Sequence, residues 1–507
     1  MRIAEGMTDR DLFDKVRLPP ELDAHLRGAN PWWEGRPGRV LPSYRRWAFD
    51  VLLRKLETEL APAVVIRGAR QVGKTTLQEQ AIKHLQEVQR VASNRILRVQ
   101  FDELGSLSGL REPLLAIARW YENRVLGRTF NEAAHAGEVA YLFLDEVQNL
   151  ADWAPQLKAL VDHNTVRVVV TGSSALRIEA GRDSLAGRIT TLELGTLLLR
   201  EIAGLRFEDA IEPIIPTNGL DHLVQQDFWL EAVRHANQHA EAMQRAFRAF
   251  SERGGYPIVH ARPDVPWAEV ADQLNETVIR RVIQHDLRLG ERGRKRDAAL
   301  LEEVFRLACR YAGQSPARAA LVSEVKEVLR ANIGWQRILN YLRFLDGALL
   351  IKLVRPLELR LKRAKGNHKL CILDPGLRAS WLEEVVPLDP DALVAAPHLG
   401  DLAGHLAESV VGAFLSTLPH LDLAHFPERP TEPEIDFILT VGEKRIPLEV
   451  KFRRRIDPMR DTLGLRSFLE KRHYNAPFGV LVTMLEGVEI TDPRVVPISL
   501  RQLLLMR

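Results

Sequence analysis

Short apolar segments alternate with amphipathic ones through the first two hundred residues. Apolar-rich runs at residues 63–66, 95–102, 141–144 and 166–170 have the length of buried strands, because parallel strands are covered on both faces. The segments between them repeat apolar residues three or four positions apart, which is typical of helices. The pattern predicts an α/β fold over residues 46–205, with a parallel sheet wrapped by helices and a ligand at the carboxyl ends of the strands.

Later segments have different patterns. Residues 206–297 are helical in pattern, with a break at Gly254-Gly255-Tyr256-Pro257 that predicts a hinge or a tight turn. Residues 298–385 contain three short helical segments followed by an apolar strand, an order that resembles a winged helix. Residues 386–507 begin with a helix and continue into strands, which predicts a separate α/β domain.

Composition narrows the class of protein. The 507 residues exceed what one hydrophobic core usually organises, so about three domains are expected. Two cysteines, an N-terminus without an apolar core and the absence of a long apolar run predict a cytoplasmic protein without a membrane span. Residues 1–45 form an extension with adjacent tryptophans at positions 32 and 33, which either stack a base or anchor the extension on its own domain.

The chemistry begins at residues 68–75, which have the spacing G-x-x-x-x-G-K-T between a predicted strand and a predicted helix. Glycines in this P-loop let backbone N–H groups point at phosphates, Lys74 reaches the terminal phosphates, and Thr75 holds Mg²⁺. We therefore predict a site for ATP with Mg²⁺. The residues expected to contact the nucleotide are Gly68, Arg70, Gln71, Val72, Gly73, Lys74, Thr75 and Thr76.

Polar residues end the two following strands. Asp145 is expected on a neighbouring strand as a second Mg²⁺ ligand, and Glu146 is expected to activate the attacking water. Ser173 or Ser174, after the next strand, would sense the γ-phosphate. Arg188 either is an ion-paired surface residue or stabilises transition-state charge, in the same chain or from a neighbouring subunit.

These motifs, in this order and together with Gly254-Gly255-Tyr256-Pro257, resemble the prokaryotic AAA-type ATPases that carry a C-terminal domain of unknown function. The resemblance extends over about residues 45–480. It implies an AAA-type fold, ATP hydrolysis, a helical lid at residues 206–297 and a homo-oligomer such as a hexameric ring.

A second acidic cluster is expected near the C-terminus. Asp436 on one strand and Glu449 with Lys451 on the next resemble the PD-(D/E)xK nuclease core, with Glu408 as an outer metal ligand. No proline precedes Asp436, in contrast to that motif. The resemblance implies a restriction-endonuclease-like fold at residues 386–507, which either cleaves DNA or has lost cleavage and keeps the cluster for structure or DNA contact.

Basic residues cluster in the later domains although the formal net charge is only +3. Residues 352–369 hold seven basic residues against one acidic residue, as a DNA-contacting wing would. The candidate DNA contacts are Arg337, Arg360, Lys362, Arg363, Lys365, Arg453 and Arg454.

Three functions fit these features. The first is an ATPase that remodels or translocates on duplex or branched DNA, with hydrolysis stimulated by DNA. The second is an ATP-dependent signalling switch or scaffold that assembles without DNA. The third is an ATP-controlled, metal-dependent nuclease.

Overall fold

A computed structural model describes residues 18–58, 60–102, 110–150, 152–172, 183–215, 219–286, 297–358, 366–430 and 432–507. The chain divides into two compact units. Unit 1 comprises residues 1–68 and 73–194, and unit 2 comprises residues 69–72 and 195–507. Among the helices of the described ranges, none combines the length and apolar character that crossing a membrane requires.

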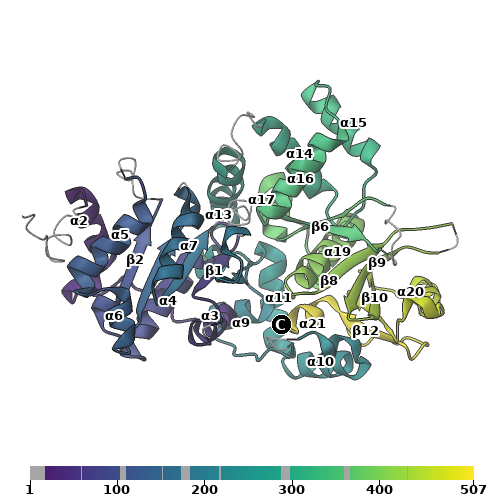
Figure 1. Ribbon diagram of the computed structural model, residues 1–507. Helices are drawn as coiled ribbons and strands as arrows, with labels where there is room; N and C mark the ends of the chain where they lie inside the picture. Colours follow the sequence, from purple (N-terminus) through teal and green to yellow (C-terminus); the bar gives the residue numbers. More distant parts are fainter. Residues whose placement is uncertain are drawn as a thin grey trace, which may run out of the picture. The chain divides into compact units, whose positions relative to one another are not determined.

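Unit 1 is built on a five-stranded parallel sheet (Figure 1). Its strands are β1 (Ala63–Arg67), β2 (Ile96–Gln100), β3 (Ala140–Asp145), β4 (Val166–Gly172) and β5 (Ile189–Glu193). They lie in the order β2-β3-β4-β1-β5, so β4 separates β1 from β3. The parallel sheet expected from the strand and helix pattern is therefore confirmed, and its carboxyl ends carry the two predicted motifs.

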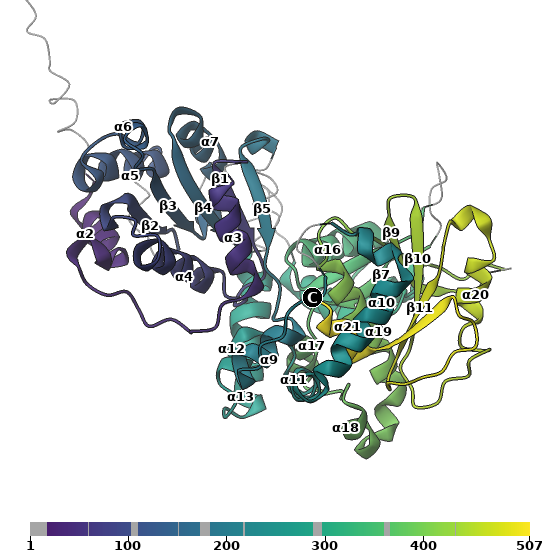
Figure 2. The same ribbon diagram turned by 90° about the horizontal axis from the view of Figure 1, so that it is seen from below.

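Helices cover both faces of this sheet. Figure 2 shows α5, α6 and α7 on one face and α3 and α4 on the other. The helices are α2 (Pro20–Ala29), α3 (Trp47–Glu57), α4 (Lys74–Glu87), α5 (Pro113–Tyr121), α6 (Phe130–His135) and α7 (Trp153–His163). Shorter helical turns are η1 (Pro31–Glu34), η2 (Ser93–Arg95), η4 (Glu122–Leu126), η5 (Val147–Asn149) and η6 (Asp183–Leu185).

The N-terminal extension packs on the edge strand β2. The indole N–H groups of Trp32 and Trp33 both donate to the Ile96 carbonyl, at 3.1 and 2.9 Å. Asn30 is fully buried and exchanges hydrogen bonds with the backbone of Arg98. The tryptophans therefore anchor the extension on its own domain, which was one of the two roles expected for them.

Unit 2 contains a mixed seven-stranded sheet in the order β12-β11-β10-β9-β8-β6-β7. Strands β8, β9 and β10 form an antiparallel meander, and β11 and β12 continue parallel to β10. The strands are β6 (Ile351–Pro356), β7 (Lys369–Ile372), β8 (Asp422–Phe426), β9 (Ile435–Val441), β10 (Lys444–Lys451), β11 (Gly479–Thr483) and β12 (Val495–Ser499).

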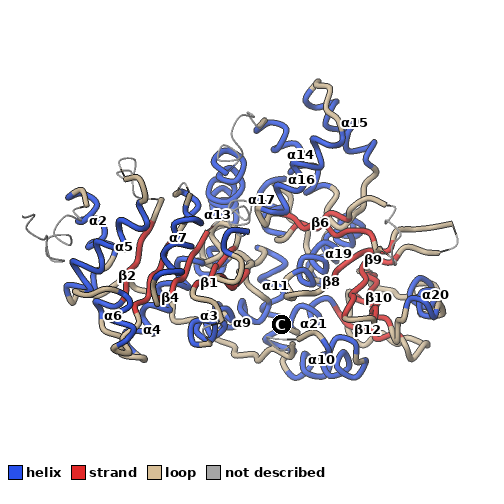
Figure 3. Tube along the Cα trace, viewed as in Figure 1, coloured by secondary structure: helices blue, strands red, loops and turns tan. Residues whose placement is uncertain are grey.

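Helices surround this sheet, as the blue segments of Figure 3 show. They are α9 (Leu199–Phe207), α10 (Gln226–Gln238), α11 (Ala240–Arg253), α12 (Pro257–Ala261), α13 (Trp267–Leu274), α14 (Ala298–Arg310), α15 (Arg318–Leu329), α16 (Trp335–Gly347), α17 (Pro375–Leu382), α18 (Pro390–Ala395), α19 (Gly400–Ser416), α20 (Leu463–Leu469) and α21 (Leu500–Leu505). Shorter turns are η7 (Asp221–Val224), η8 (Asn275–Ile279), η9 (Val282–Asp286), η10 (Pro397–Leu399) and η11 (Arg472–Tyr474).

One hydrophobic core joins segments that the sequence pattern assigned to different domains. Side chains of α9, α10 and α11 lie in the same buried cluster as α19, α21 and one side of the seven-stranded sheet. A second, smaller cluster under α20 covers other residues of that sheet. Residues 206–253 therefore share their core with residues 386–507, and the finer domain boundaries expected at 297 and 385 stay predictions.

The Gly254-Gly255 break is a close packing contact and a turn. Gly254 has φ +74° and ψ −159°, a conformation essentially restricted to glycine. The buried Asp374 accepts hydrogen bonds from the N–H groups of Gly255 at 2.7 Å and Gly376 at 2.8 Å. A β-carbon on Gly254 would lie 2.2 Å from an Asp374 carboxylate oxygen. We call this contact between residues 254–255 and 374–376 the clasp.

Candidate ATP site and C-terminal ion cluster

The P-loop connects β1 to α4 through residues with unusual backbone angles. Gln71 has φ +63° and Gly73 has φ +95°, in the left-handed region that glycine adopts without strain. A β-carbon on Gly73 would meet no atom within 4 Å, so a turn of the chain, not close packing, requires this glycine. Helix α4 begins directly afterwards at Lys74, and its first N–H groups have no partner within the helix.

Lys74 is held at the mouth of this turn. Its side chain is 5% exposed, and its ammonium donates to the Gly68 carbonyl at 3.1 Å. The Glu146 carboxylate lies 4.0 Å from the same ammonium. The P-loop lysine and the predicted catalytic glutamate are therefore close to each other, as ATP hydrolysis requires.

Asp145 joins the P-loop helix to the centre of the sheet. Its carboxylate accepts from the Thr75 hydroxyl at 2.9 Å and from the Thr171 hydroxyl. Burial raises the pKa of Asp145, while these two hydroxyls and Arg98 act in the opposite direction. Thr75 and Asp145 thus place two hard oxygen donors together, which is the kind of ligand that Mg²⁺ prefers.

The strand order explains the role of Thr171, which begins the polar stretch 171–174 but was not itself among the predicted site residues. Asp145 was expected on a strand next to the P-loop strand, but β4 lies between β1 and β3. Thr171 of β4 fills that position, and its hydroxyl also accepts from the N–H of Glu146 at 3.2 Å. Glu146 has φ +53°, and Gln148 donates to its carboxylate. The backbone bend and these two contacts orient the Glu146 side chain.

Arg98 of β2 is a further residue that sequence reasoning missed. Its guanidinium lies 3.0 Å from Glu79 of α4 and 3.8 Å from Asp145. No motif marks Arg98, because its position depends on β2 lying beside β3. The signal available in the sequence was a basic residue inside an otherwise apolar strand.

These residues fit a nucleotide with Mg²⁺. The P-loop turn, Lys74 and the first turn of α4 would hold phosphates, and Thr75 with Asp145 would hold the metal ion. Mg²⁺, when bound, neutralises charge on the phosphates. Glu146 is placed beside these groups, where its carboxylate can accept a proton from water.

The remaining catalytic candidates, Ser173, Ser174 and Arg188, have different outcomes. Ser173 and Ser174 lie outside the described residues, so the sensor assignment stays a prediction. Arg188 precedes β5, and its carbonyl accepts from the N–H of Ala63, the first residue of β1. It therefore lies at the amino ends of the strands, opposite the edge with the P-loop, where it forms an ion pair with Asp162. This position does not fit contact with ATP in the same chain; a role in a neighbouring subunit stays a prediction.

Two segments of the chain match known families. Residues 61–203 match the family described as "AAA domain", and residues 244–385 match a domain of unknown function, DUF8612. Residues 61–203 are an AAA-type ATPase domain. The site described above lies inside this ATPase domain, and the clasp lies inside the region that matches the domain of unknown function.

Two relatives of this chain are uncharacterised proteins. An uncharacterised protein of Methanocaldococcus jannaschii is 24% identical over 404 residues, 78% of this chain and 77% of that protein. An uncharacterised protein of Haemophilus influenzae is 24% identical over 319 residues, 62% of this chain and 68% of that protein.

Solved structures with partial similarity include the Walker-type ATPase PABY2304 of Pyrococcus abyssi, which is 14% identical in sequence. The matched region spans 69% of this chain and 99% of that protein, with a TM-score of 0.37. The Aeropyrum pernix ORC1 protein, solved in complex with DNA, is 15% identical in sequence. The matched region spans 76% of this chain and 96% of that protein, with a TM-score of 0.26.

The acidic cluster of unit 2 contains a lysine that the sequence interpretation assigned elsewhere. Lys369 of β7, which was counted among the basic residues of the wing, is 1% exposed. Its ammonium lies 2.8 Å from Glu408 and 2.5 Å from Asp436. Burial alone would lower the pKa of Lys369, but Asp436 and Glu408 raise it above its ordinary value. Lys369 is therefore a charged member of the cluster and not a DNA-facing residue.

The other members complete an ion cluster, defined as Lys369, Glu408, Asp436, Glu449 and Lys451. Asp436 also accepts from the N–H of Val450 at 2.9 Å, and Lys451 pairs with Glu449. Burial opposes ionisation of Asp436, but Lys369 and Lys451 hold its pKa below its ordinary value. Burial and Asp436 raise the pKa of Glu449 to about 8. The four predicted residues Glu408, Asp436, Glu449 and Lys451 do come together, and Lys369 lies between two of them as a fifth member.

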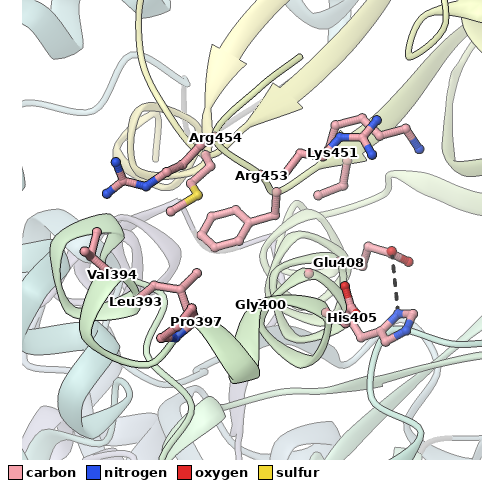
Figure 4. A pocket seen from close by; sticks show the side chains of 14 residues that line it. Leu393, Val394, Pro397, Gly400, His405, Glu408, Lys451, Arg453 and Arg454 are labelled. Carbon is pink, nitrogen blue, oxygen red and sulfur yellow. Dashed lines mark ion pairs between the residues drawn. The ribbon is translucent and has the colours of Figure 1, made fainter. Parts of the chain in front are cut away.

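A cavity of about 810 Å³ opens beside this cluster. Figure 4 shows Leu393, Val394 and Pro397 on one side and His405 with Glu408 on the other. Lys451, Arg453 and Arg454 line it as well, with Arg454 on the side of Leu393 and Val394, so charged and apolar side chains are mixed around the cavity. Arg453 pairs with Asp461 and Arg454 contacts the Pro390 carbonyl, so both expected DNA contacts have partners within unit 2.

Most of the expected wing residues cannot be assessed. Arg360, Lys362, Arg363 and Lys365 lie outside the described residues. Arg337 lies on α16, is 50% exposed and has an Asp297 carboxylate at 3.4 Å. Within the described parts of the chain, no group of three or more His, Cys, Asp and Glu side chains is arranged to hold a metal ion.

Proposed function

We propose that this chain couples ATP hydrolysis in residues 61–203 to the binding and remodelling of duplex or branched DNA, and that residues 298–372 recognise the DNA. The observation that carries the proposal is the exposed face of α16. This face holds Gln336, Arg337, Asn340 and Arg343, while Ile338, Tyr341, Leu342, Phe344 and Leu345 are buried.

The chemistry of that face suits base recognition. Positions 336, 340 and 343 follow a helical spacing of four and three residues, so their side chains share one side of the helix. Asparagine and glutamine recognise adenine and arginine recognises guanine in the major groove, which is wide enough for one helix. The four side chains of α16 on this face are polar or basic, and a partly exposed Asp297 carboxylate from outside the helix lies 3.4 Å from Arg337.

The surroundings of α16 support the same proposal. Helices α14, α15 and α16 pack on one another and lead into the antiparallel pair β6 and β7, an order that resembles a winged helix. Between β6 and β7 the sequence contains Arg360, Lys362, Arg363 and Lys365. Four cations in one short stretch of sequence suit phosphate contact beside the groove.

The test compares DNA affinity of Asn340→Ala and Arg337→Ala with the wild type by fluorescence anisotropy, using duplex, forked and four-way DNA at two salt concentrations. Loss of one base contact should cost about 1–3 kcal/mol on the preferred sequence. Loss of a phosphate contact should weaken all sequences alike and lower the salt slope by about one. Lys83→Ala removes an equally exposed cation of α4 and serves as the matched control.

Different outcomes separate the alternatives. Unchanged affinity in both α16 variants would contradict the proposed recognition helix. If no nucleic acid binds or stimulates the ATPase, the signalling switch or scaffold is favoured, and mass measurement with and without ATP should then show ATP-dependent assembly. We extend the proposal to a homo-oligomer, because AAA-type domains typically assemble, and the same mass measurement tests the oligomer. The cytoplasmic location stays a prediction.

We also propose that residues 386–507 have a restriction-endonuclease-like fold. The supporting order is α19, then the meander β8-β9-β10, then α20, then β11 parallel to β10. Asp436 lies on β9 and Glu449 and Lys451 lie on β10, as the resemblance implies for such a core.

A further inference from the structure

Metal-dependent nucleases of this proposed fold need a divalent cation between their acidic side chains, yet this cluster already contains a cation. The Lys369 ammonium lies between Glu408 of α19 and Asp436 of β9. We infer that Lys369 is the permanent cation of the ion cluster, so that residues 386–507 contact their ligand without a divalent metal and do not cleave DNA. This inference rests on the proposed nuclease-like fold.

Both oxygens of Asp436 and one oxygen of Glu408 are engaged, whereas one buried oxygen of Glu449 has no hydrogen-bond partner in the described parts of the chain. One oxygen of Asp436 faces the Lys369 ammonium and the other accepts the N–H of Val450 at 2.9 Å. Glu408 directs one oxygen at the same ammonium. Mg²⁺ demands oxygen ligands at about 2.1 Å in near-octahedral geometry, so it would have to displace the ammonium from both carboxylates.

The lysine is built into the fold and cannot readily leave. Lys369 is the first residue of β7, which pairs with β6. Its side chain is 1% exposed, and the ammonium lies 5.0 Å from the centre of the Phe437 ring. An ammonium above an aromatic ring is attracted by the ring quadrupole, and this attraction is stronger where water is excluded. Two carboxylates and one ring therefore hold the cation.

A second lysine strengthens the argument. Lys451 pairs with Glu449, the carboxylate that the nuclease motif would assign to the metal. The raised pKa of Glu449, about 8, reduces its ionisation near neutral pH, so the ammonium groups of Lys369 and Lys451 already offset the remaining negative charge of the cluster. A divalent cation would add repulsion from both ammonium groups. Because the two lysines neutralise the carboxylates of the cluster, the basic side chains of Arg453 and Arg454 in the neighbouring cavity make that cavity suited to an anion.

The test measures Mn²⁺ binding to the nucleotide-free full chain by electron paramagnetic resonance of the free ion. We compare the wild type, Asp436→Asn, Lys369→Met and the double variant. Wild type and Asp436→Asn should bind equal amounts of Mn²⁺. Lys369→Met removes the ammonium and should gain about one Mn²⁺ per chain, and Asp436→Asn in that background should abolish the gain. ATPase activity of each variant monitors folding of the other unit, and circular dichroism monitors folding of this one.

Two results would overturn the inference: Mn²⁺ bound by the wild type and lost in Asp436→Asn, or metal-dependent cleavage of plasmid DNA lost in that variant. If Lys369→Met does not fold, the comparison of wild type with Glu408→Gln, a side chain at the cavity, decides the question by the same criteria. Because the metal measurement contains no DNA, its failure is distinguishable from a failure of the proposed DNA binding.

Discussion

Disruption of the clasp should strongly destabilise unit 2. Gly254→Ala would place a methyl group 2.2 Å from an oxygen of Asp374, 2.7 Å from the N of Gly376 and 2.9 Å from its α-carbon. Two of these three atoms belong to the backbone, so no side-chain rotation removes the overlap. The Asp374 turn would have to move away from residues 254–255.

The expected magnitude follows from two terms. The backbone of Gly254 lies in a region that costs any other residue about 1–3 kcal/mol. Burial raises the pKa of Asp374 to about 7, so its carboxylate is charged above that pH. There, displacing Asp374 also loses its hydrogen bonds from Gly255 and Gly376, each worth about 1.5–3 kcal/mol because one partner is charged. The sum is at least about 4 kcal/mol, a large part of the 5–15 kcal/mol that stabilises a typical domain.

The assay is urea unfolding of the full chain followed by circular dichroism and tryptophan fluorescence. Gly404→Ala is the matched control, because Gly404 lies on α19 with a negative φ and no atom within 4 Å of an added β-carbon. Alanine should stabilise the helix there by up to about 1 kcal/mol. If Gly254→Ala unfolds within 1 kcal/mol of the wild type, the steric account of the clasp is refuted.

Three further predictions concern the ATP site and pH. Glu146→Gln should lower the ATP hydrolysis rate about 10²–10⁴-fold while ATP affinity measured by calorimetry stays unchanged, since the amide cannot accept a proton; an active variant would exclude Glu146 as the base. Thr171→Val should lower hydrolysis about tenfold or more, because Asp145 loses a buried hydroxyl partner. Thr165→Val is the control and should not lower hydrolysis, because Thr165 precedes β4 and lies outside the site. His260 is buried, its Nε2–H donates to the Gly254 carbonyl at 2.7 Å, and burial lowers its pKa to about 4. The unfolded chain therefore binds more protons between pH 4 and 6.5, so stability should fall as pH drops through that window by up to about 3 kcal/mol, and His260→Gln should lack this component in urea unfolding at each pH.

The ATP site was largely predictable from local patterns. A P-loop needs a glycine turn between a strand and a helix, and Asp145-Glu146 needs a buried strand before it; both requirements can be recognised in short stretches of sequence. Thr171 and Arg98 were not recognised, because their roles depend on strand order. Nothing in the residues themselves indicates that β4 is inserted between β1 and β3.

Lys369 illustrates the opposite situation. In the sequence it belongs to a run of basic residues, where an exposed wing is the simplest interpretation. In the fold it begins β7, and the neighbouring α19 and β9 bring Glu408 and Asp436 to its ammonium from 39 and 67 positions away. The same lysine thus changes from a candidate DNA contact to the centre of a buried cluster.

The sequence by itself determined the chemistry of the P-loop, because phosphate binding depends on backbone geometry and adjacent side chains within eight residues. It also determined which carboxylates and lysines were available near the C-terminus. Only the tertiary structure decided which of them meet: Lys369 with Glu408 and Asp436, Thr171 with Asp145, and Gly254 with Asp374. The physical reason is that burial and charge pairing act between residues brought together by sheet order and helix packing, whereas sequence motifs report only neighbours along the chain.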